Sequence, residues 1–161
     1  MTEQATTERT REKAGKYLTF VLAGEEYGLE ILKVREIIGM MDITAVPRTP
    51  GFVKGVINLR GKVIPVVDLR LKFEMPAAEQ TAETCIIVVY LGTMEMGIMV
   101  DKVSEVLDIV GEDIEEAPSF GVNVDTAFIL GIGKSAGRVT ILLDISKVLT
   151  GQEIQAVTSV A

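Results

Sequence analysis

The 161-residue sequence predicts an all-β protein made of two small five-stranded β-barrels, with short helical turns and a C-terminal helix. Three observations lead to this prediction: an internal repeat, short strand-like runs separated by glycine-containing turns, and an aliphatic composition. Hydrophobic residues make up 48% of the chain and tryptophan is absent, so the predicted core is aliphatic. Small sheets of this kind avoid exposed edges by curling into barrels, which favours the barrel architecture.

A motif that occurs twice is the most informative feature of the chain. Six positions recur 76 residues later, in the pairs Phe52 and Phe128, Gly55 and Gly131, Gly61 and Gly137, Val63 and Val139, Asp68 and Asp144, and Leu69 and Ile145. The preceding segments match at a spacing of 69 residues, in the pairs Gly28 and Gly97, Lys33 and Lys102, Val34 and Val103, and Glu36 and Glu105. A unit of about 60 residues is marginal by itself, so the two copies are expected to fold together.

The first copy begins with a predicted tail and a hairpin. Residues 1–15 are polar without apolar periodicity and are expected to be flexible. Residues 17–22 and 27–29 have strand-like composition and flank a turn at Gly24, which predicts a β-hairpin. A brief helical turn at residues 31–34 is expected to follow, and then a further strand.

The second copy predicts the same order of elements. Residues 85–91 and 95–100 are expected to form a hairpin around Gly92, with a helical turn at residues 101–103 before the next strand. The single cysteine, Cys85, opens the first of these strands. Without a second cysteine it cannot form an internal disulfide, and a small buried hydrophobe is the favoured interpretation.

Each copy then contains a second predicted hairpin. Residues 53–58 and 62–67 are apolar, β-branched runs joined by a short glycine-containing loop, and residues 128–133 and 138–143 repeat the pattern. Pro65 lies within the second run of the first hairpin. Because proline cannot donate a ladder hydrogen bond, it predicts a sheet edge or a bulge at that point.

A polar segment divides the predicted domain. Residues 74–83 contain a proline and several acids, and they are the best candidate for a linker. One domain is therefore expected over residues 16–150, with one barrel subdomain at residues 16–80 and a second at residues 83–150. Residues 151–161 are predicted to be a weakly specified C-terminal tail.

Residue types with catalytic or metal-binding chemistry are scarce. The chain has no histidine and one cysteine, which excludes the usual hydrolase triads and zinc sites. Residues 133–135 resemble the end of a phosphate-binding loop but lack its first glycine, and the acids at residues 112–116 lack the spacing of a calcium loop. Asp68 and Asp144 each precede a predicted helical turn, where helix capping is favoured over a catalytic carboxylate pair. We therefore expect a protein that is not an enzyme and has no cofactor or metal.

Charge and hydropathy exclude two further classes of partner. The net charge is −7 and only eight residues are aromatic, without a strongly basic stripe, so nucleic acid is not an expected partner. No run approaches the roughly 18 apolar residues of a membrane span, and the first residues do not form a signal peptide. A cytoplasmic protein without membrane insertion is the expectation.

Arg60 lies at the tip of a predicted hairpin, where core packing gives no reason for an arginine. It has two interpretations that the residues alone leave open. It is either an exposed loop charge or a partner-facing fork for a carboxylate or a backbone carbonyl.

Three segments carry a resemblance to a known family. Residues 52–70, which contain the Asn-Leu-Arg-Gly hairpin, are similar to the CheW-like domain family of chemotaxis coupling proteins, as are residues 31–37 and 97–103. The resemblance covers roughly residues 15–150. It implies two SH3-like barrels and a non-enzymatic adaptor that links the cytoplasmic tips of chemoreceptors, the methyl-accepting chemotaxis proteins, to the regulatory domain of the histidine kinase CheA. It also implies recruitment to membrane-associated receptor arrays.

The resemblance also implies a receptor-binding groove between the barrels. Its residues carry over to Val34, Glu36, Gly55, Arg60 and Val106, and the strand that Cys85 opens borders the groove. Kinase contacts are implied at the outer ends of the barrels, without assignment to single residues. The alternatives are a CheW-like module of another receptor–kinase array, including the CheV type, the isolated regulatory domain of a CheA-type kinase, and an enzyme.

Overall fold

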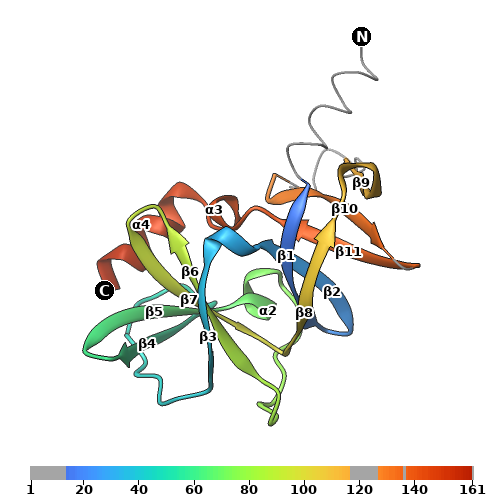
Figure 1. Cartoon of the computed structure of the whole chain (residues 1–161). Helices are drawn as coiled ribbons and strands as arrows, with labels where there is room; N and C mark the ends of the chain where they lie inside the picture. The colour runs from blue at the N-terminus through green and yellow to red at the C-terminus, as the bar shows by residue number, and fades with distance from the viewer. Residues whose placement is uncertain (1–13, 117–126, 136, 161) are drawn as a thin grey trace.

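The computed structural model describes residues 14–116, 127–135 and 137–160, which form two β-sheets and several short helices (Figure 1). Of the tail predicted at residues 1–15, all but the last two residues lie outside the described part. The strands are β1 (Gly15–Leu22), β2 (Glu25–Glu30), β3 (Val34–Gly39), β4 (Val53–Leu59), β5 (Lys62–Asp68), β6 (Cys85–Leu91), β7 (Met94–Val100), β8 (Lys102–Ile109), β9 (Ile114–Glu115), β10 (Ile129–Ser135) and β11 (Arg138–Leu143). The helices are η1 (Ile31–Lys33), α2 (Leu69–Lys72), η2 (Gly111–Asp113), α3 (Ile145–Val148) and α4 (Gly151–Val160).

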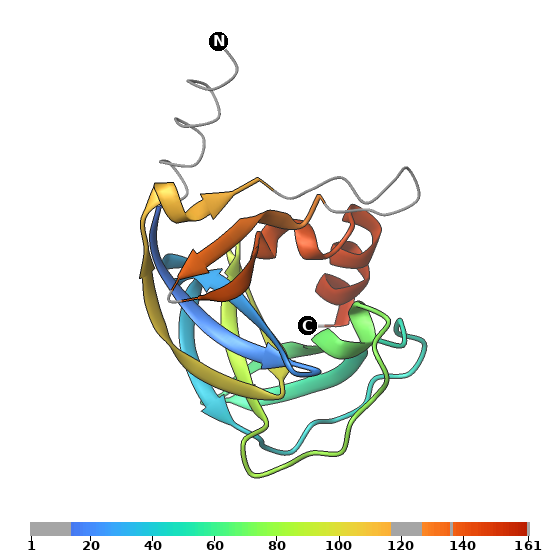
Figure 2. The ribbon, with the colours of Figure 1, turned by 90° about the vertical axis from the view of Figure 1, so that its right-hand side faces the viewer.

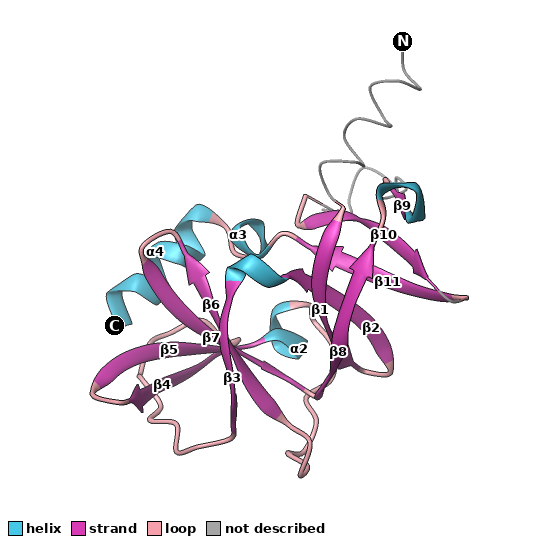
Figure 3. Ribbon diagram, viewed as in Figure 1, coloured by secondary structure: helices cyan, strands magenta, loops and turns pink. Residues whose placement is uncertain are grey.

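The strands divide into two sheets that lie side by side. Sheet A has the strand order β8-β1-β2-β11-β10-β9, and sheet B has the order β3-β6-β7-β5-β4. Figure 3 shows sheet B on the left and sheet A on the right, and Figure 2 shows how strongly the strands curve. The all-β prediction is therefore confirmed, but neither sheet closes into a hydrogen-bonded barrel within the described residues. The two-residue strand β9 gives sheet A one strand more than predicted.

Each sheet combines strands from both copies of the repeat. The β1–β2 hairpin lies in sheet A between β8 and β11, and the β6–β7 hairpin lies in sheet B between β3 and β5. The exchange is symmetric, because Val66 of β5 lies opposite Gly97 of β7 and Leu142 of β11 lies opposite Gly28 of β2, both in parallel pairs. These positions are related by the two repeat spacings, so the pairings are equivalent.

The predicted division into one barrel subdomain at residues 16–80 and a second at residues 83–150 is therefore wrong, because each sheet contains strands from both ranges. The first hairpin of each copy pairs on both sides with the other copy, β1 with β8 and β2 with β11. This arrangement covers both edges of each hairpin, which would otherwise expose unpaired backbone groups. The two copies share both sheets, as expected of units too small to be stable alone.

Pro65 is not on an edge strand, because β5 lies between β7 and β4. Its partner across the β4–β5 pair is Val56, whose N–H and C=O both bond to Thr44 at 2.9 Å on the other side. Pairing with β7 begins only at Val66. No ladder hydrogen bond is therefore required from Pro65. The register shift that was expected nearby lies in β4, between Val53 and Gly55.

One predicted helical turn is present and the other is absent. η1 confirms the turn after the first hairpin, whereas β8 begins at Lys102 directly after β7. The prediction at residues 101–103 is wrong because Lys102 and Val103 pair with Val21 and Phe20 of β1 as part of β8, and the Asp101 carboxylate before them is held by two partners. Arg70 Nε donates to Asp101 Oδ1 at 2.7 Å, and the backbone N–H of Ala23 donates to Oδ2 at 3.0 Å.

The helices α2, α3 and α4 begin at capping residues. The side chains of Asp68 and Asp144 accept backbone N–H bonds from the first turns of α2 and α3, which confirms the capping prediction. The prediction of a weakly specified tail after residue 150 is wrong, since α4 forms there. Thr150 and Glu153 bond reciprocally at 2.7 and 3.2 Å as a capping box, and Val157 is fully buried in the core.

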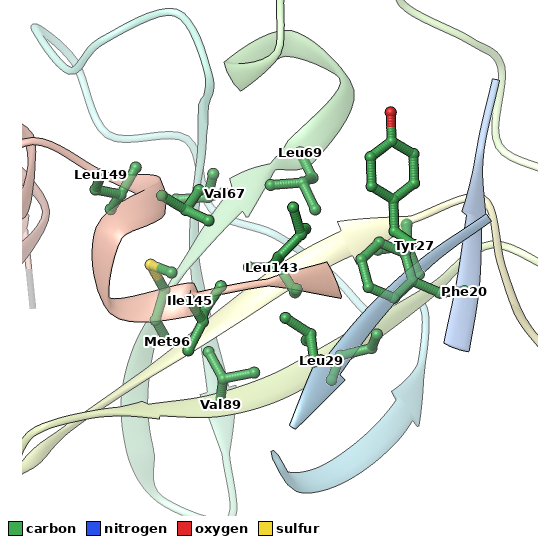
Figure 4. Close-up of a cluster of buried hydrophobic side chains, with 14 of the residues drawn as sticks. Phe20, Tyr27, Leu29, Val67, Leu69, Val89, Met96, Leu143, Ile145 and Leu149 are labelled. Atoms are coloured by element: carbon green, nitrogen blue, oxygen red, sulfur yellow. The ribbon is translucent and has the colours of Figure 1, made fainter. Parts of the chain in front are cut away.

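The main core lies between the two sheets (Figure 4). Side chains alternate along each strand, so Ile87 and Val89 of β6 face this central core, whereas Ile86 and Val88 face a second cluster on the other side of sheet B. A third, smaller cluster lies on the far side of sheet A. The labelled residues of the central core are Phe20, Tyr27, Leu29, Val67, Leu69, Val89, Met96, Leu143, Ile145 and Leu149.

Candidate partner-binding surface

The edge strands β3 and β8 lie on the same side of the molecule, one at the end of each sheet (Figures 1 and 2). Val34 of β3 and Val103 of β8 are both partly buried against the central core. Three residues further along, Ile37 and Val106 are 45% and 49% exposed. We call these two strands, with the hairpin tip described below, the edge-strand surface.

The direction of the exposed apolar residues follows from their pairing. Directly opposed residues point to the same face of a sheet. Ile37 pairs with Ile87 and Val106 pairs with Leu18, and both partners belong to the central core. Ile37 and Val106 therefore both face the space between the sheets, one from each.

Arg60 lies at the tip of the β4–β5 hairpin and reaches back to β3. Its backbone φ of +53° and the φ of +88° at Gly61 form the tight turn, which Asn58 closes by accepting the Gly61 N–H at 2.8 Å through Oδ1. The Arg60 guanidinium donates to the Glu36 carboxylate. That hydrogen bond holds the pKa of Glu36 below its ordinary value and raises the pKa of Arg60. Arg60 keeps 61% of its side chain exposed, so its other donors remain available to a partner.

Further ion pairs surround this contact. Arg35 Nη1 lies 3.3 Å from Glu36 and 3.1 Å from Glu95 of β7, and Lys62 Nζ lies 3.4 Å from Glu95. Two carboxylates thus share three cations. We call this group the sheet B charge cluster. It holds the hairpin tip against the edge strand.

The structure brings together only some of the predicted site residues. Val34, Glu36 and Arg60 lie on or beside β3. Val106 lies on β8 of the other sheet, and the repeat spacing of 69 residues makes Ile37 of β3 its equivalent. Sequence reasoning missed Ile37, although that spacing applied to Val106 would have identified it.

Gly55 lies apart from this surface, whereas Cys85 borders it. Gly55 is buried in β4 with φ +143°, and a β-carbon there would collide with the carbonyl oxygen of Thr44. Gly55 therefore shapes the backbone. Cys85 is half-buried against the central core at the start of β6, where it lies opposite Gly39 of β3 and its thiol bonds to the backbone of Val103 of β8. Burial raises the pKa of the Cys85 thiol, which disfavours a reactive thiolate.

Chemical features of other site classes are missing from the described part of the chain. Its Cys, Asp and Glu residues form no group of three that could hold a metal ion. No helix there is long and apolar enough to cross a membrane.

Comparisons with known proteins agree with one another. A family model for the CheW-like domain matches residues 16–153. The chain is 43% identical to the chemotaxis protein CheW of Klebsiella aerogenes over 91% of this chain and 88% of that protein. It is 34% identical to the chemotaxis protein CheW of Rhizobium meliloti, over 86% and 90%. The crystal structure of the scaffolding protein TtCheW from Thermoanaerobacter tengcongensis superposes with a TM-score of 0.79 at 36% identity, covering 87% of this chain and 95% of that chain.

Proposed function

The chain belongs to the family of CheW-like domains, and from this premise we propose that it is a chemotaxis adaptor that couples chemoreceptors to the histidine kinase CheA. The observation that carries the proposal is the family match over residues 16–153. The neighbouring solved structure is named a scaffolding protein, which supports a non-enzymatic role. These matches favour the adaptor over the alternatives of a kinase fragment or an enzyme.

The edge-strand surface is the proposed receptor site. A chemoreceptor tip is a helical hairpin, and an amphipathic helix docks its apolar face against exposed apolar side chains. Ile37 and Val106 supply such side chains from the two sheets. Glu36 pairs with Val88, so it and Arg60 lie on the other face of β3, at the rim of this surface, where we expect their ion pair to set the register of the partner.

The regulatory domain of CheA is the second proposed partner. The resemblance gives it the same fold and places its contacts at the outer ends of the sheets, away from the edge-strand surface. Adaptor and kinase then alternate in arrays beneath the membrane, and the adaptor acts in the cytoplasm.

A charge reversal at Arg60 tests the proposed site. Arg60→Glu removes the contact with Glu36 and should abolish capture of a receptor tip fragment, while the melting temperature changes little because Arg60 is largely exposed. Lys134→Glu is a matched control, since Lys134 is an exposed cation on the equivalent β10–β11 hairpin. This variant should still capture the receptor tip fragment. A collapse of the melting temperature in Arg60→Glu, or equal loss in the control, would contradict the assignment.

A further inference from the structure

The helix α4 covers the inner face of the last two strands of sheet B. It packs against β4 and β5, and its side chains Ile154 and Val157 join the central core. An ion pair holds the edge of the helix, because a carboxylate oxygen of Glu153 lies 2.9 Å from the ammonium of Lys72. An amphipathic helix with a carboxylate at its edge therefore completes this half of the molecule.

The equivalent face of sheet A is open. The strands β10 and β11 are the repeat equivalents of β4 and β5, but they border a pocket of ≈570 Å³. Figure 2 shows the orange strands β10 and β11, the green helix α2 and the red helix α3 around this region. The size of the pocket and its apolar lining are those of a binding site. We call it the sheet A pocket, and its apolar lining is Tyr27, Phe73, Met75, Phe128, Ile129 and Ile141.

The chain turns away from the sheet A pocket after α2. Glu74 is the repeat equivalent of Thr150, which caps α4. Glu74 instead adopts a φ of +59°, and Arg70 Nη1 donates to the carbonyl oxygen of Pro76 at 3.0 Å. Residues 78–80 then line a separate pocket. The segment equivalent to α4 therefore does not cover β10 and β11.

Stacked aromatic rings form one wall of the pocket. The ring centroids of Tyr27 and Phe73 lie 6.0 Å apart, and those of Phe73 and Phe128 lie 5.0 Å apart. This stacking joins the end of α2 to sheet A, so the wall is formed before any partner binds. Phe73 is only partly buried, whereas its equivalent Leu149 is buried in the half of the molecule that α4 covers.

Lys147 is the cation that the pocket offers to an occupant. Its side chain is 63% exposed, and its ammonium lies 3.9 Å from Asp144, whose carboxylate also caps α3. The other lysine of the lining, Lys72, is already paired with Glu153. Glu74 is an exposed acid of the lining. A carboxylate of an occupant is therefore favoured beside Lys147 and disfavoured beside Glu74.

We propose that the sheet A pocket binds an amphipathic helix of a partner protein, with its apolar face toward the pocket and a carboxylate beside Lys147. The packing of α4 on sheet B is the precedent within the same chain, because α4 places apolar side chains and one carboxylate on the equivalent strands. The position equivalent to Lys72 holds Val148, and its neighbour Lys147 supplies the cation instead. A small carboxylate is a poorer occupant, since one short apolar group fills only part of the pocket.

The sheet A pocket is separate from the edge-strand surface. The strands β10 and β11 lie toward the other end of sheet A from β8, and in Figure 2 the helices α2 and α3 lie on the opposite side of the molecule from β3 and β8. The pocket therefore adds a docking surface to the proposed adaptor and does not depend on the receptor assignment.

Titration of the isotope-labelled full chain with a helical peptide tests the proposal. The probe has the sequence of residues 150–160 and is locked as a helix by a lactam bridge on its solvent-facing side. The methyl resonances of Ile129 and Ile141 should shift saturably. Those of Val53, on the strand that α4 covers, and of Val106, on the edge-strand surface, are internal controls and should not shift.

A charge swap tests the contact with Lys147. Lys147→Glu should weaken binding of the probe by about fivefold, and a probe that carries Glu153→Lys should restore it. Lys16→Glu is the matched control, because Lys16 is also 63% exposed with a carboxylate at 3.9 Å. This control should bind the probe as the unmodified chain does.

The apolar contact is tested by a probe that carries Ile154→Ser and Val157→Ser, which should not bind. The proposal is overturned if the helical probe causes no saturable shift at Ile129 and Ile141, if the serine probe binds equally, or if Val53 shifts to the same extent. It is also overturned if the charge reversals at Lys147 and Lys16 have the same effect. Sodium hexanoate that binds as tightly as the helical probe would make the pocket a small-molecule site instead.

Discussion

Replacing Gly55 by alanine separates a structural role from a contact role at a residue that the family resemblance assigned to the receptor site. Gly55 is buried in β4 with φ +143°, and its missing β-carbon leaves room for the Thr44 carbonyl. That carbonyl accepts the Val56 N–H at 2.9 Å, and Thr44 N–H donates to Val56 at the same distance. An alanine must displace the Thr44 segment and break this bridge.

The cost of Gly55→Ala follows from two terms. Losing the two backbone hydrogen bonds of the bridge costs about 1 kcal/mol each. A side chain at this backbone conformation adds about 1–3 kcal/mol of strain. The free energy of unfolding should therefore fall by about 3–5 kcal/mol, which corresponds to a melting temperature lower by about 6–20 °C for a chain of this size.

Urea denaturation followed by circular dichroism measures this change, and it suits a chain without tryptophan. Gly39→Ala is the matched control, because a β-carbon at Gly39 meets no atom within 4 Å and its φ is not positive. Gly39→Ala should change stability by less than about 0.5 kcal/mol. If Gly55→Ala is as stable as the unmodified chain but loses receptor capture, Gly55 is a contact residue and the structural reasoning is refuted.

Three further predictions concern the core, the pH dependence and the receptor surface. Val157→Ala should lower the free energy of unfolding by about 2 kcal/mol, because Val157 anchors α4 in the central core. Urea denaturation measures this change, and an unchanged value would mean that α4 does not pack against the core. The hydrogen bond from Arg70 lowers the pKa of Asp101, so its stabilising contribution is complete above the ordinary pKa of about 3.9 and is lost as the pH falls through the lowered value. Arg70→Met should remove this part of the acid dependence between about pH 5 and pH 2, and an unaltered acid profile would show that the pair is not linked to folding. Val34→Asp or Val106→Asp, if folded by circular dichroism, should abolish receptor pull-down and spare the binary complex with the kinase regulatory domain; loss of both complexes would unite the two surfaces, and loss of neither would exclude the edge-strand surface as the receptor site.

The sequence predicted the elements better than their partners. The hairpins and the caps at Asp68 and Asp144 depend on local patterns, which determine turns and helix starts wherever the strands finally pair. The exchange of the β1–β2 and β6–β7 hairpins could not be predicted, because the two copies have equivalent patterns. Gly28 and Gly97 suit either copy equally well, so local sequence does not distinguish pairing within a copy from pairing between copies.

The remaining errors have separate causes. The capping box of Thr150 and Glu153 is a local sequence signal for α4, and it distinguishes this segment from a weakly specified tail. At the candidate site, the hairpin tip position of Arg60 followed from turn chemistry, but its contact with Glu36 required the curvature of sheet B. The burial of Gly55 depends on the Thr44 bridge, which joins segments that no local pattern connects.

The central claim is that one adaptor binds a receptor tip and the kinase regulatory domain at the same time through separate surfaces. Titration calorimetry of the kinase regulatory domain into the chain, with and without a saturating receptor tip fragment, tests it most directly. Binding at tens of micromolar or tighter, expected even of a weak interface of about 1,000 Å², should appear in both titrations, and sedimentation should reveal the ternary complex. Absence of kinase binding, or its loss when the receptor tip is present, would contradict the account.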